Sequence, residues 1–180
     1  MNIKKMINQK DLVGITRKHD QEEIQSVILD HGENLLFIQY IFDFYLDGYK
    51  IINKNDIIDI SISDVDILQK QILINEKLLN NIKKPFQINL SNWKSSFNDL
   101  KNQNVILSVE NETTNLDFFL LGKILDVLDN SIKMKYFDGM CKWNDISMEI
   151  KFKDIKTISL FSNYNNKYAN FIKAQNTASN

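Results

Sequence analysis

The stretch from Gly122 to Ile158 most constrains the fold, because its apolar and polar side chains alternate with the two-residue period of a β-strand. Ile132, Met134 and Tyr136 alternate with two lysines, which is typical of a strand with one face in a core and the other in water. Asp129-Asn130 interrupts the pattern and favours a turn. The sequence therefore predicts a meander of short strands over this stretch.

A similar pattern lies between Ser26 and Ile60. A shift of 96 residues places Ile28-Leu29-Asp30 on Ile124-Leu125-Asp126, and it aligns polar positions as well, with Asn34 on Asn130. A further shift of two residues aligns the Asp-Ile pairs at 56–57 and 154–155. Alternating apolar residues often align by chance, but the polar residues between the strands rarely do. We therefore predict an internal duplication with about five short strands in each copy.

The predicted fold class is mainly β with connecting helices (α+β), in two tandem small five-stranded barrels of the Sm-like or SH3-like kind. Close turns leave no room for the crossover helices of βαβ units, and closure of a barrel removes exposed strand edges. With 43% hydrophobic residues, the chain can bury a real core. We expect a first barrel at 1–63, a helical connector at 64–104, and a second barrel with a C-terminal helix at 105–180.

Local signals place turns and helix starts. Asp47-Gly48 suits a tight turn that needs positive φ. Asp64 or Asp66 is expected to cap the first connector helix, and Ser91 the second. In the C-terminal helix, Tyr164, Tyr168 and Phe171 are expected on or near one face.

Charge and cysteine content restrict the setting and the partner. Residues 11–63 contain ten acidic and four basic side chains, a balance of −6, although the whole chain carries only −1. An acidic first half disfavours a nucleic-acid partner, whose phosphates need clustered Lys and Arg. One cysteine, no apolar run after the first lysines, and no apolar stretch near the roughly 20 residues of a membrane span predict a cytoplasmic protein without disulfides.

Three segments carry a family resemblance: SNWKSSFNDLKNQNVILSVE, FFLLGKILDVLDNSIKMKYFDGMCKWND and IKFKDIKTISLFSNYNNKY. They resemble a group of uncharacterised bacterial proteins with tandem small β-barrels, in which a Trp-bearing helix precedes a barrel with a Phe-Asp, Gly and Trp loop. The resemblance implies a fold and no known activity. This chain departs from the pattern because Cys141, rather than glycine, precedes Lys142-Trp143.

No residue set predicts catalysis. The carboxylates of Asp126, Asp129, Asp138 and Asp145 lack the spacing of a calcium loop and occur where Asp favours turns. His19 and His31 are not at metal-ligand spacing, Cys141 has no evident histidine partner, and no Gly-rich phosphate loop is present. We therefore expect no enzyme activity, no cofactor and no metal.

Two loops combine aromatic and acidic residues. The loop from Tyr136 to Asp145 also contains Asp138 and Trp143, and the matching loop, Ile41 to Tyr49, contains Asp43 and Asp47. Trp143 either plugs the end of a barrel or contacts a partner. The candidate partner-binding residues are Tyr136, Asp138, Trp143, Asp145, Asp43, Asp47 and Tyr49.

The leading functional hypothesis is a protein-binding module with a basic or extended partner, of immunity or inhibitor type. The alternative is an Sm-like RNA-binding protein, which rests on fold analogy alone. A third possibility is an enzyme with an unrecognised site, for which a ligand or metal held by Asp138 and Asp145 would be the sign. The pattern leaves the oligomeric state open.

Overall fold

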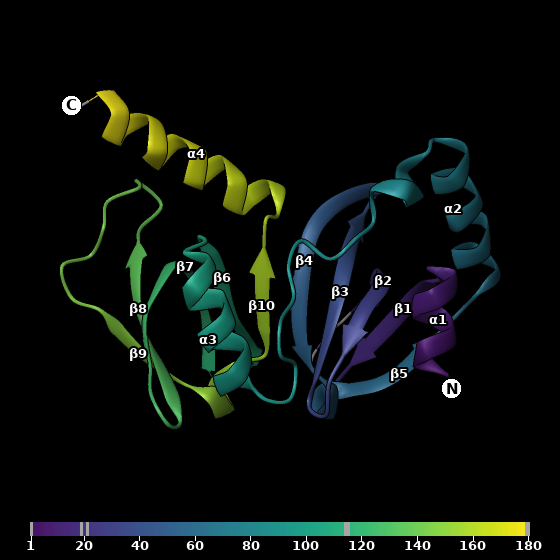
Figure 1. Ribbon diagram of the computed structural model, residues 1–180, viewed down its shortest axis with the longest axis horizontal. Coiled ribbons are helices and arrows are strands. Elements are labelled where there is room, and N and C mark those ends of the chain that lie inside the picture. The colour runs from purple at the N-terminus through teal and green to yellow at the C-terminus, as the bar shows by residue number, and fades with distance from the viewer. Residues whose placement is uncertain (1, 19, 21, 114–115, 179–180) are drawn as a thin grey trace. The chain divides into compact units, whose positions relative to one another are not determined.

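The computed structural model describes residues 2–18, 20, 22–113 and 116–178. The chain divides into two compact units, Met1–Asn92 and Trp93–Asn180. The boundary lies within the segment that the sequence predicts as a helical connector. One connector helix therefore belongs to each unit, and both helices help to build a sheet-based unit (Figure 1).

The first unit contains five strands that are consecutive in sequence, with hydrogen-bonded order β5-β1-β2-β3-β4. Its elements are α1 (Ile3–Gln9), β1 (Leu12–Arg17), β2 (Ile24–His31), β3 (Leu35–Phe42), β4 (Tyr45–Asn53), the 3₁₀ helix η1 (Lys54–Asp56), β5 (Ile57–Ser61), α2 (Asp64–Asn75) and the 3₁₀ helix η2 (Leu78–Asn81). β2 and β3 pair as an antiparallel hairpin on either side of Gly32.

The sheet of the first unit has an apolar core on each face, because neighbouring residues in a strand point to opposite sides. On one face Ile3, Met6 and Ile7 of α1 pack against buried side chains of the strands, namely Val13, Ile15, Ile24, Ile28, Leu36, Ile38, Ile52 and Ile60. On the other face Leu73 of α2 packs with Leu12, Val27, Ile41 and Ile82. Each helix thus covers one side of the sheet.

The second unit repeats this strand count with the order β10-β6-β7-β8-β9. Its elements are α3 (Trp93–Gln103), β6 (Leu107–Thr113), β7 (Leu116–Val127), β8 (Ser131–Phe137), β9 (Met148–Lys151), the 3₁₀ helix η3 (Phe152–Asp154), β10 (Thr157–Leu160) and α4 (Asn163–Ala178). Trp93, Ser96, Phe97 and Leu100 form the buried side of α3. In α4, Ile172 packs with Leu121 and Phe137.

The prediction of two closed five-stranded barrels is wrong, because the strands form open antiparallel sheet. Among the described strands of the first unit, β4 and β5 are outermost in the order and do not pair with each other; β5 follows η1 and pairs with β1. In the second unit β10 follows η3 and pairs with β6 rather than β9. Closure depends on strand tilt and stagger, which alternation of side chains does not encode.

The two units share local details at the offset found in the sequence. The register of β2 against β3 shifts between Ile28 and Asp30, and that of β7 against β8 shifts between Ile124 and Asp126. A 3₁₀ turn precedes the last strand of each unit. The two units thus share a strand order and a register shift. This is a similarity of structure, and the internal duplication stays a prediction.

Two local predictions need correction. The turn between β3 and β4 lies at Asp43 and Phe44, which have φ of 43° and 66°, and not at Asp47-Gly48. Gly48 has φ of 72° within β4, at a register shift, so its positive φ serves a bulge. The N-cap of α2 is Ser63, which forms a capping box with Asp66.

Candidate functional site

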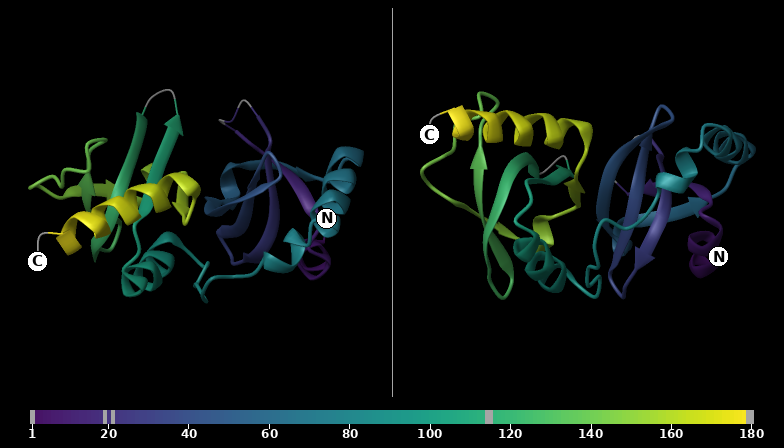
Figure 2. Two further views of the ribbon diagram at one scale, coloured as in Figure 1. Left: turned by 90° about the horizontal axis from the view of Figure 1, so that it is seen from above. Right: turned by 45° about the horizontal axis from the view of Figure 1, so that its top comes forward.

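An open pocket of about 240 Å³ lies in the second unit, among β7, β8, the loop after β8 and α4. Its walls include five aromatic side chains and one carboxylate, from Phe119, Tyr136, Phe137, Tyr164, Tyr168 and Asp138. We call this the aromatic pocket. Figure 2 shows α4 crossing the β7–β8 strand pair, which brings tyrosines from the end of the chain to residues of the sheet.

The aromatic rings form a continuous row. Phe119 meets Tyr164 edge to face at 5.6 Å between centroids, Tyr164 lies 5.0 Å from Tyr168, and Tyr168 stacks on Phe137 at 5.8 Å. Two factors produce the row: a four-residue spacing places both tyrosines on one face of α4, and pairing of β7 with β8 places Leu121 opposite Phe137. Phe119 and Tyr164 are 50% and 51% exposed, so part of the row faces solvent.

Burial decreases from the bottom of the pocket to its rim. Phe137 is only 5% exposed and packs with Leu121 and Ile172, so it forms part of the core. Tyr136 and Tyr168 are half-buried. The pKa of Tyr164 is raised above its ordinary value, mainly by a hydrogen bond with Tyr168 and to a smaller extent by burial. The Tyr164 hydroxyl therefore stays protonated at neutral pH, and its ring presents a neutral π face.

Asp138 is fixed by the loop that it begins. Its Oδ1 accepts hydrogen bonds from the backbone N–H groups of Met140 and Lys142, both at 2.9 Å. The backbone N–H of Asp138 donates to the carbonyl of Lys142 at 3.0 Å. Oδ2 takes part in neither of the two side-chain bonds. Asp138 thus organises the loop through one oxygen and adds a negative charge to the exposed rim of the pocket.

Cys141 occupies the strained position of this loop. It has φ of 61°, in the left-handed region where a side chain is disfavoured and glycine is not. The turn at Cys141 is therefore held at a conformational cost that glycine would avoid. The thiol is free and half-buried, against the same apolar cluster as Phe137.

Trp143 lies beside the pocket rather than in its wall. Its ring meets Phe137 edge to face at 5.0 Å, and Lys135 Nζ lies 6.0 Å from its centroid. The indole is half-buried in the cluster that contains Phe137, whereas Asp145 is exposed further along the loop. The structure thus places Tyr136 and Asp138 in the pocket wall and Trp143 beside it, whereas Asp145 is exposed and is not part of the wall.

The three candidate residues of the first unit do not share one loop. Asp43 lies in the β3–β4 turn and is exposed, Asp47 is half-buried at the β4 bulge, and Tyr49 lies within β4. The Tyr49 ring is 5.7 Å from that of Phe37, and burial raises the pKa of Tyr49. The exposed aromatic residues at this turn are Phe42, Phe44 and Tyr45.

Sequence reasoning missed Phe119, Tyr164 and Tyr168 as site residues. Phe119 lies in β7, in a run of apolar residues that suggests only core. The four-residue spacing of the tyrosines was noticed, but it predicts a packed helix face equally well. The available signal was the excess of large aromatic residues on a short polar helix, and only the fold shows that this helix crosses β8.

In the described part of the chain, no group of three or more His, Cys, Asp or Glu side chains is placed to hold a metal ion. His19, considered above with His31, lies outside the described residues. None of the described helices is long and apolar enough to cross a membrane.

No family model, curated protein or solved structure matches this chain. The resemblance to tandem-barrel proteins therefore stays a prediction, and its barrel component is corrected by the open sheets.

Proposed function

We propose that this chain is a non-enzymatic, cytoplasmic protein-binding module of inhibitor type, whose aromatic pocket takes a basic side chain of a partner protein. The observation that carries the proposal is the row of partly exposed rings beside the carboxylate of Asp138. Such a pocket offers packing for an aliphatic stem and negative potential for the charge at its end.

Cation–π attraction and the carboxylate act on the same ligand. A Lys or Arg charge over an aromatic face gains about 0.5–1 kcal/mol at exposed sites and more where it is desolvated. The half-buried Tyr136 and Tyr168 supply the desolvated part of the pocket. Their neighbour Asp138 supplies the charge. An acidic ligand would instead be repelled by Asp138, and an apolar one would leave this carboxylate without a counter-charge.

The charge of the first unit agrees with a basic partner. Residues 11–63 carry ten acidic and four basic side chains. A surface potential of one sign raises the association rate of an oppositely charged partner and weakens with salt. This long-range attraction does not depend on where the partner docks. It therefore indicates that the partner is basic, and the docking site is proposed from the pocket alone.

The test is affinity capture from the native host with the full chain as bait. Asp138→Asn keeps an Oδ1 acceptor for the loop and removes only the charge, and Tyr164→Ala removes a wall of the pocket. Phe171→Ala is the matched control, since Phe171 is an exposed aromatic residue of α4 outside the pocket wall. We expect the wild-type chain and the Phe171→Ala variant to capture the same partner protein. Both pocket variants are expected to fail to capture it.

Two results would contradict this function. One is equal capture of the protein by both pocket variants, provided that circular dichroism shows them folded. The other is stoichiometric recovery of RNA with no protein. The captured partner is then mixed with wild type at increasing salt, and its affinity is expected to fall as the ionic contribution is screened.

A further inference from the structure

The second helix of the first unit presents an unusual set of exposed aliphatic side chains. Val65, Ile67, Leu68 and Ile74 of α2, with Ile62 before its N-cap, are between 41% and 62% exposed. We call these five residues the aliphatic surface. Only Asp66 and Leu73 of α2 are buried. A helix with aliphatic residues on most of its circumference is normally enclosed by protein, so this exposure indicates a contact.

The helix geometry shows how the surface is arranged. Leu73 faces the sheet, where it packs with Leu12 and Val27. Val65 and Leu68 are three residues apart and lie together on one flank of α2, while Ile67 and Ile74 are seven apart and lie together on the other. The two aliphatic rows therefore flank the exposed Gln71 and Asn75, whose side chains bond to each other at 3.1 Å. Another helix that packs along either flank of α2 contacts aliphatic side chains.

Folding of the chain does not require this exposure. α2 is held by its buried Leu73, by the capping box of Ser63 with Asp66, and by Lys70, which bonds to the Asp11 carboxylate at 2.7 Å and the Gln9 carbonyl at 2.9 Å. Polar residues at the four exposed positions of the helix would leave all of these contacts intact. Exposed aliphatic residues cost solubility, so a binding role accounts for them better than a structural one.

The charges around the aliphatic surface indicate the partner. Asp59, Asp64 and Glu76 are exposed near its two ends, whereas Lys70 is directed to Asp11 and leaves Lys77 as the exposed lysine of this segment. Over residues 59–77 there are four acidic and two basic residues, a balance of −2. An anionic membrane surface and a second copy of the same acidic segment would both be repelled.

The backbone of α2 restricts the shape of the partner. Its N–H and C=O groups are bonded within the helix, so an extended segment cannot add to it by backbone pairing, and docking has to proceed through side chains. We propose that the aliphatic surface binds an amphipathic helix of a partner protein, with aliphatic residues on one face and Lys or Arg at its margins. This site is separate in residues from the aromatic pocket, and either can fail alone.

The test uses a synthetic peptide of about 18 residues, long enough to form a helix, with Leu at i, i+3, i+4 and i+7 and Lys elsewhere. The full chain is titrated into the labelled peptide and anisotropy is measured. A double variant, Val65→Ser with Leu68→Ser, is expected to weaken binding at least about tenfold. Ile146→Ser is the matched control, because Ile146 is an 80% exposed aliphatic residue of the second unit, and it is expected to bind as wild type does.

A peptide with Glu in place of Lys distinguishes charge from apolarity alone, and it is expected to bind at least about tenfold more weakly. Equal binding of both peptides, or unchanged binding by the double variant, would overturn the proposal. Light scattering measures the oligomeric state and so tests self-association. If the wild type is a dimer and the double variant is a monomer, the surface binds a second copy of the chain instead. Because Asp138→Asn leaves this surface intact, its effect on the captured partner tests the aromatic pocket independently.

Discussion

Single residues of the loop after β8 carry both strain and charge. Cys141 has φ of 61° although it carries a side chain, while Gly139, two residues earlier, is at a position where an added Cβ would meet nothing within 4 Å. Asp138 holds the loop through one oxygen. The glycine that relieves strain is therefore not at the residue that needs it, and the loop keeps its shape through the hydrogen bonds of Asp138.

Replacement of Cys141 tests this strain. Cys141→Gly and Cys141→Ala remove the same contact of the thiol with the Phe137 cluster, but only glycine adopts the left-handed region without penalty. We expect the Gly variant to exceed the Ala variant in free energy of unfolding by about 1 kcal/mol, as measured by urea denaturation. An Ala variant as stable as the Gly variant would show that the loop relaxes to another conformation.

Trp143 separates a packing role from a binding role. Its edge-to-face contact with Phe137 and its half-buried position predict that Trp143→Ala lowers the free energy of unfolding by about 1–3 kcal/mol. Urea denaturation measures this change. Binding is measured by partner capture under conditions in which the variant is still folded. Lost stability with retained capture assigns Trp143 to packing. Retained stability with lost capture would make it a contact residue and refute the packing role.

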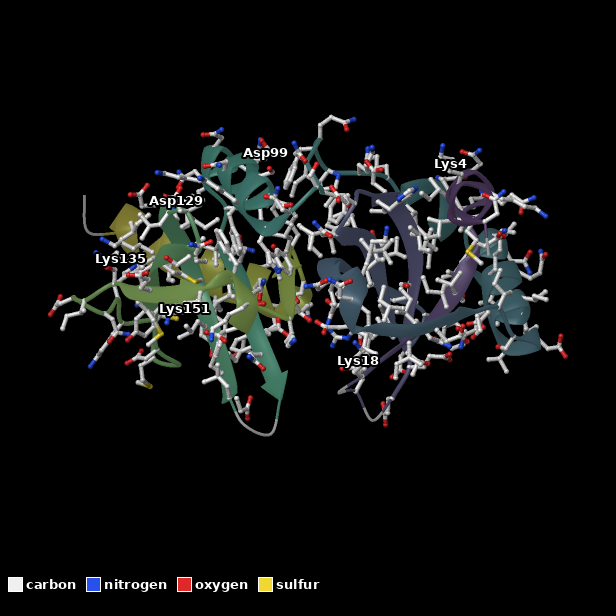
Figure 3. All side chains as sticks on the ribbon, turned by 90° about the horizontal axis from the view of Figure 1, so that it is seen from below. Lys4, Lys18, Asp99, Asp129, Lys135 and Lys151 are labelled. Atoms are coloured by element: carbon white, nitrogen blue, oxygen red, sulfur yellow. The ribbon has the colours of Figure 1, made fainter. Side chains whose placement is uncertain are left out.

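Two exposed ion pairs join α3 to the β7–β8 hairpin and provide mutual controls. Lys101 bonds to Asp126 at 2.9 Å and Lys94 to Asp129 at 2.7 Å. In each case the hydrogen bond from lysine is the largest cause that lowers the pKa of the carboxyl below its ordinary value. Figure 3 shows Asp129 on the second unit with its side chain at the surface.

We expect Lys101→Met to raise the pKa of Asp126 and leave that of Asp129 unchanged, and Lys94→Met to do the reverse, in an NMR titration of the carboxyl carbons. Because a lowered folded-state pKa favours the charged form, each pair adds stability above the ordinary pKa of aspartate. This stability is lost as the pH falls through the lowered value. An Asp126 pKa that does not respond to Lys101→Met would contradict the pairing.

At the scale of elements, the β7–β8 pairing is the framework of the aromatic pocket. Gly122 lies opposite Tyr136, and a Cβ at Gly122 would come within 2.0 Å of the Lys135 carbonyl oxygen. The two strands thus approach so closely that only glycine fits. This approach also sets the position of Tyr136 and Phe137, since both follow Lys135 in the same strand.

Gly122→Ala is expected to lower the free energy of unfolding by more than about 2 kcal/mol, because backbone rather than a flexible side chain would have to move. Gly139→Ala is the control, and it is expected to be neutral within about 0.5 kcal/mol. Both are measured by thermal and urea denaturation. Full stability of the Gly122 variant would mean that the two strands lie further apart than described.

The whole molecule has an almost balanced formal charge. It contains 22 basic and 23 acidic residues. The lysines labelled in Figure 3, which are Lys4, Lys18, Lys135 and Lys151, come from α1, the segment after β1, β8 and β9. The RNA-binding alternative relied on a closed Sm-like barrel, and the open sheets remove that support.

We therefore expect no binding of a short oligouridine RNA at low salt, where ionic affinity is greatest. Anisotropy of a labelled RNA in about 50 mM salt is the measurement. A poly-lysine peptide of similar length serves as the positive control for the acidic surface. Affinity for RNA that falls steeply with salt would revive the nucleic-acid alternative and oppose the proposed basic partner.

The sequence by itself determined the parts that depend on neighbours along the chain. Period-two alternation indicated most of the strands, whereas the two predicted N-caps of α2, Asp64 and Asp66, lie one and three residues after the actual cap, Ser63. These signals are local, because side-chain direction in a strand and caps in a helix are set within a few residues. Tyr136 and Asp138 line the aromatic pocket and Trp143 lies beside it, but their role in binding stays a prediction.

Only the tertiary structure decided whether the sheets close, where α4 lies, and which apolar residues remain exposed. Open sheet follows from the pairing of β5 with β1 and of β10 with β6, which depends on contacts far apart in sequence. Phe119 and Tyr164 meet only because α4 crosses the β7–β8 pair. Leu68 resembles a core residue in the sequence. Its exposure is decided by the face of α2 that Leu73 turns to the sheet.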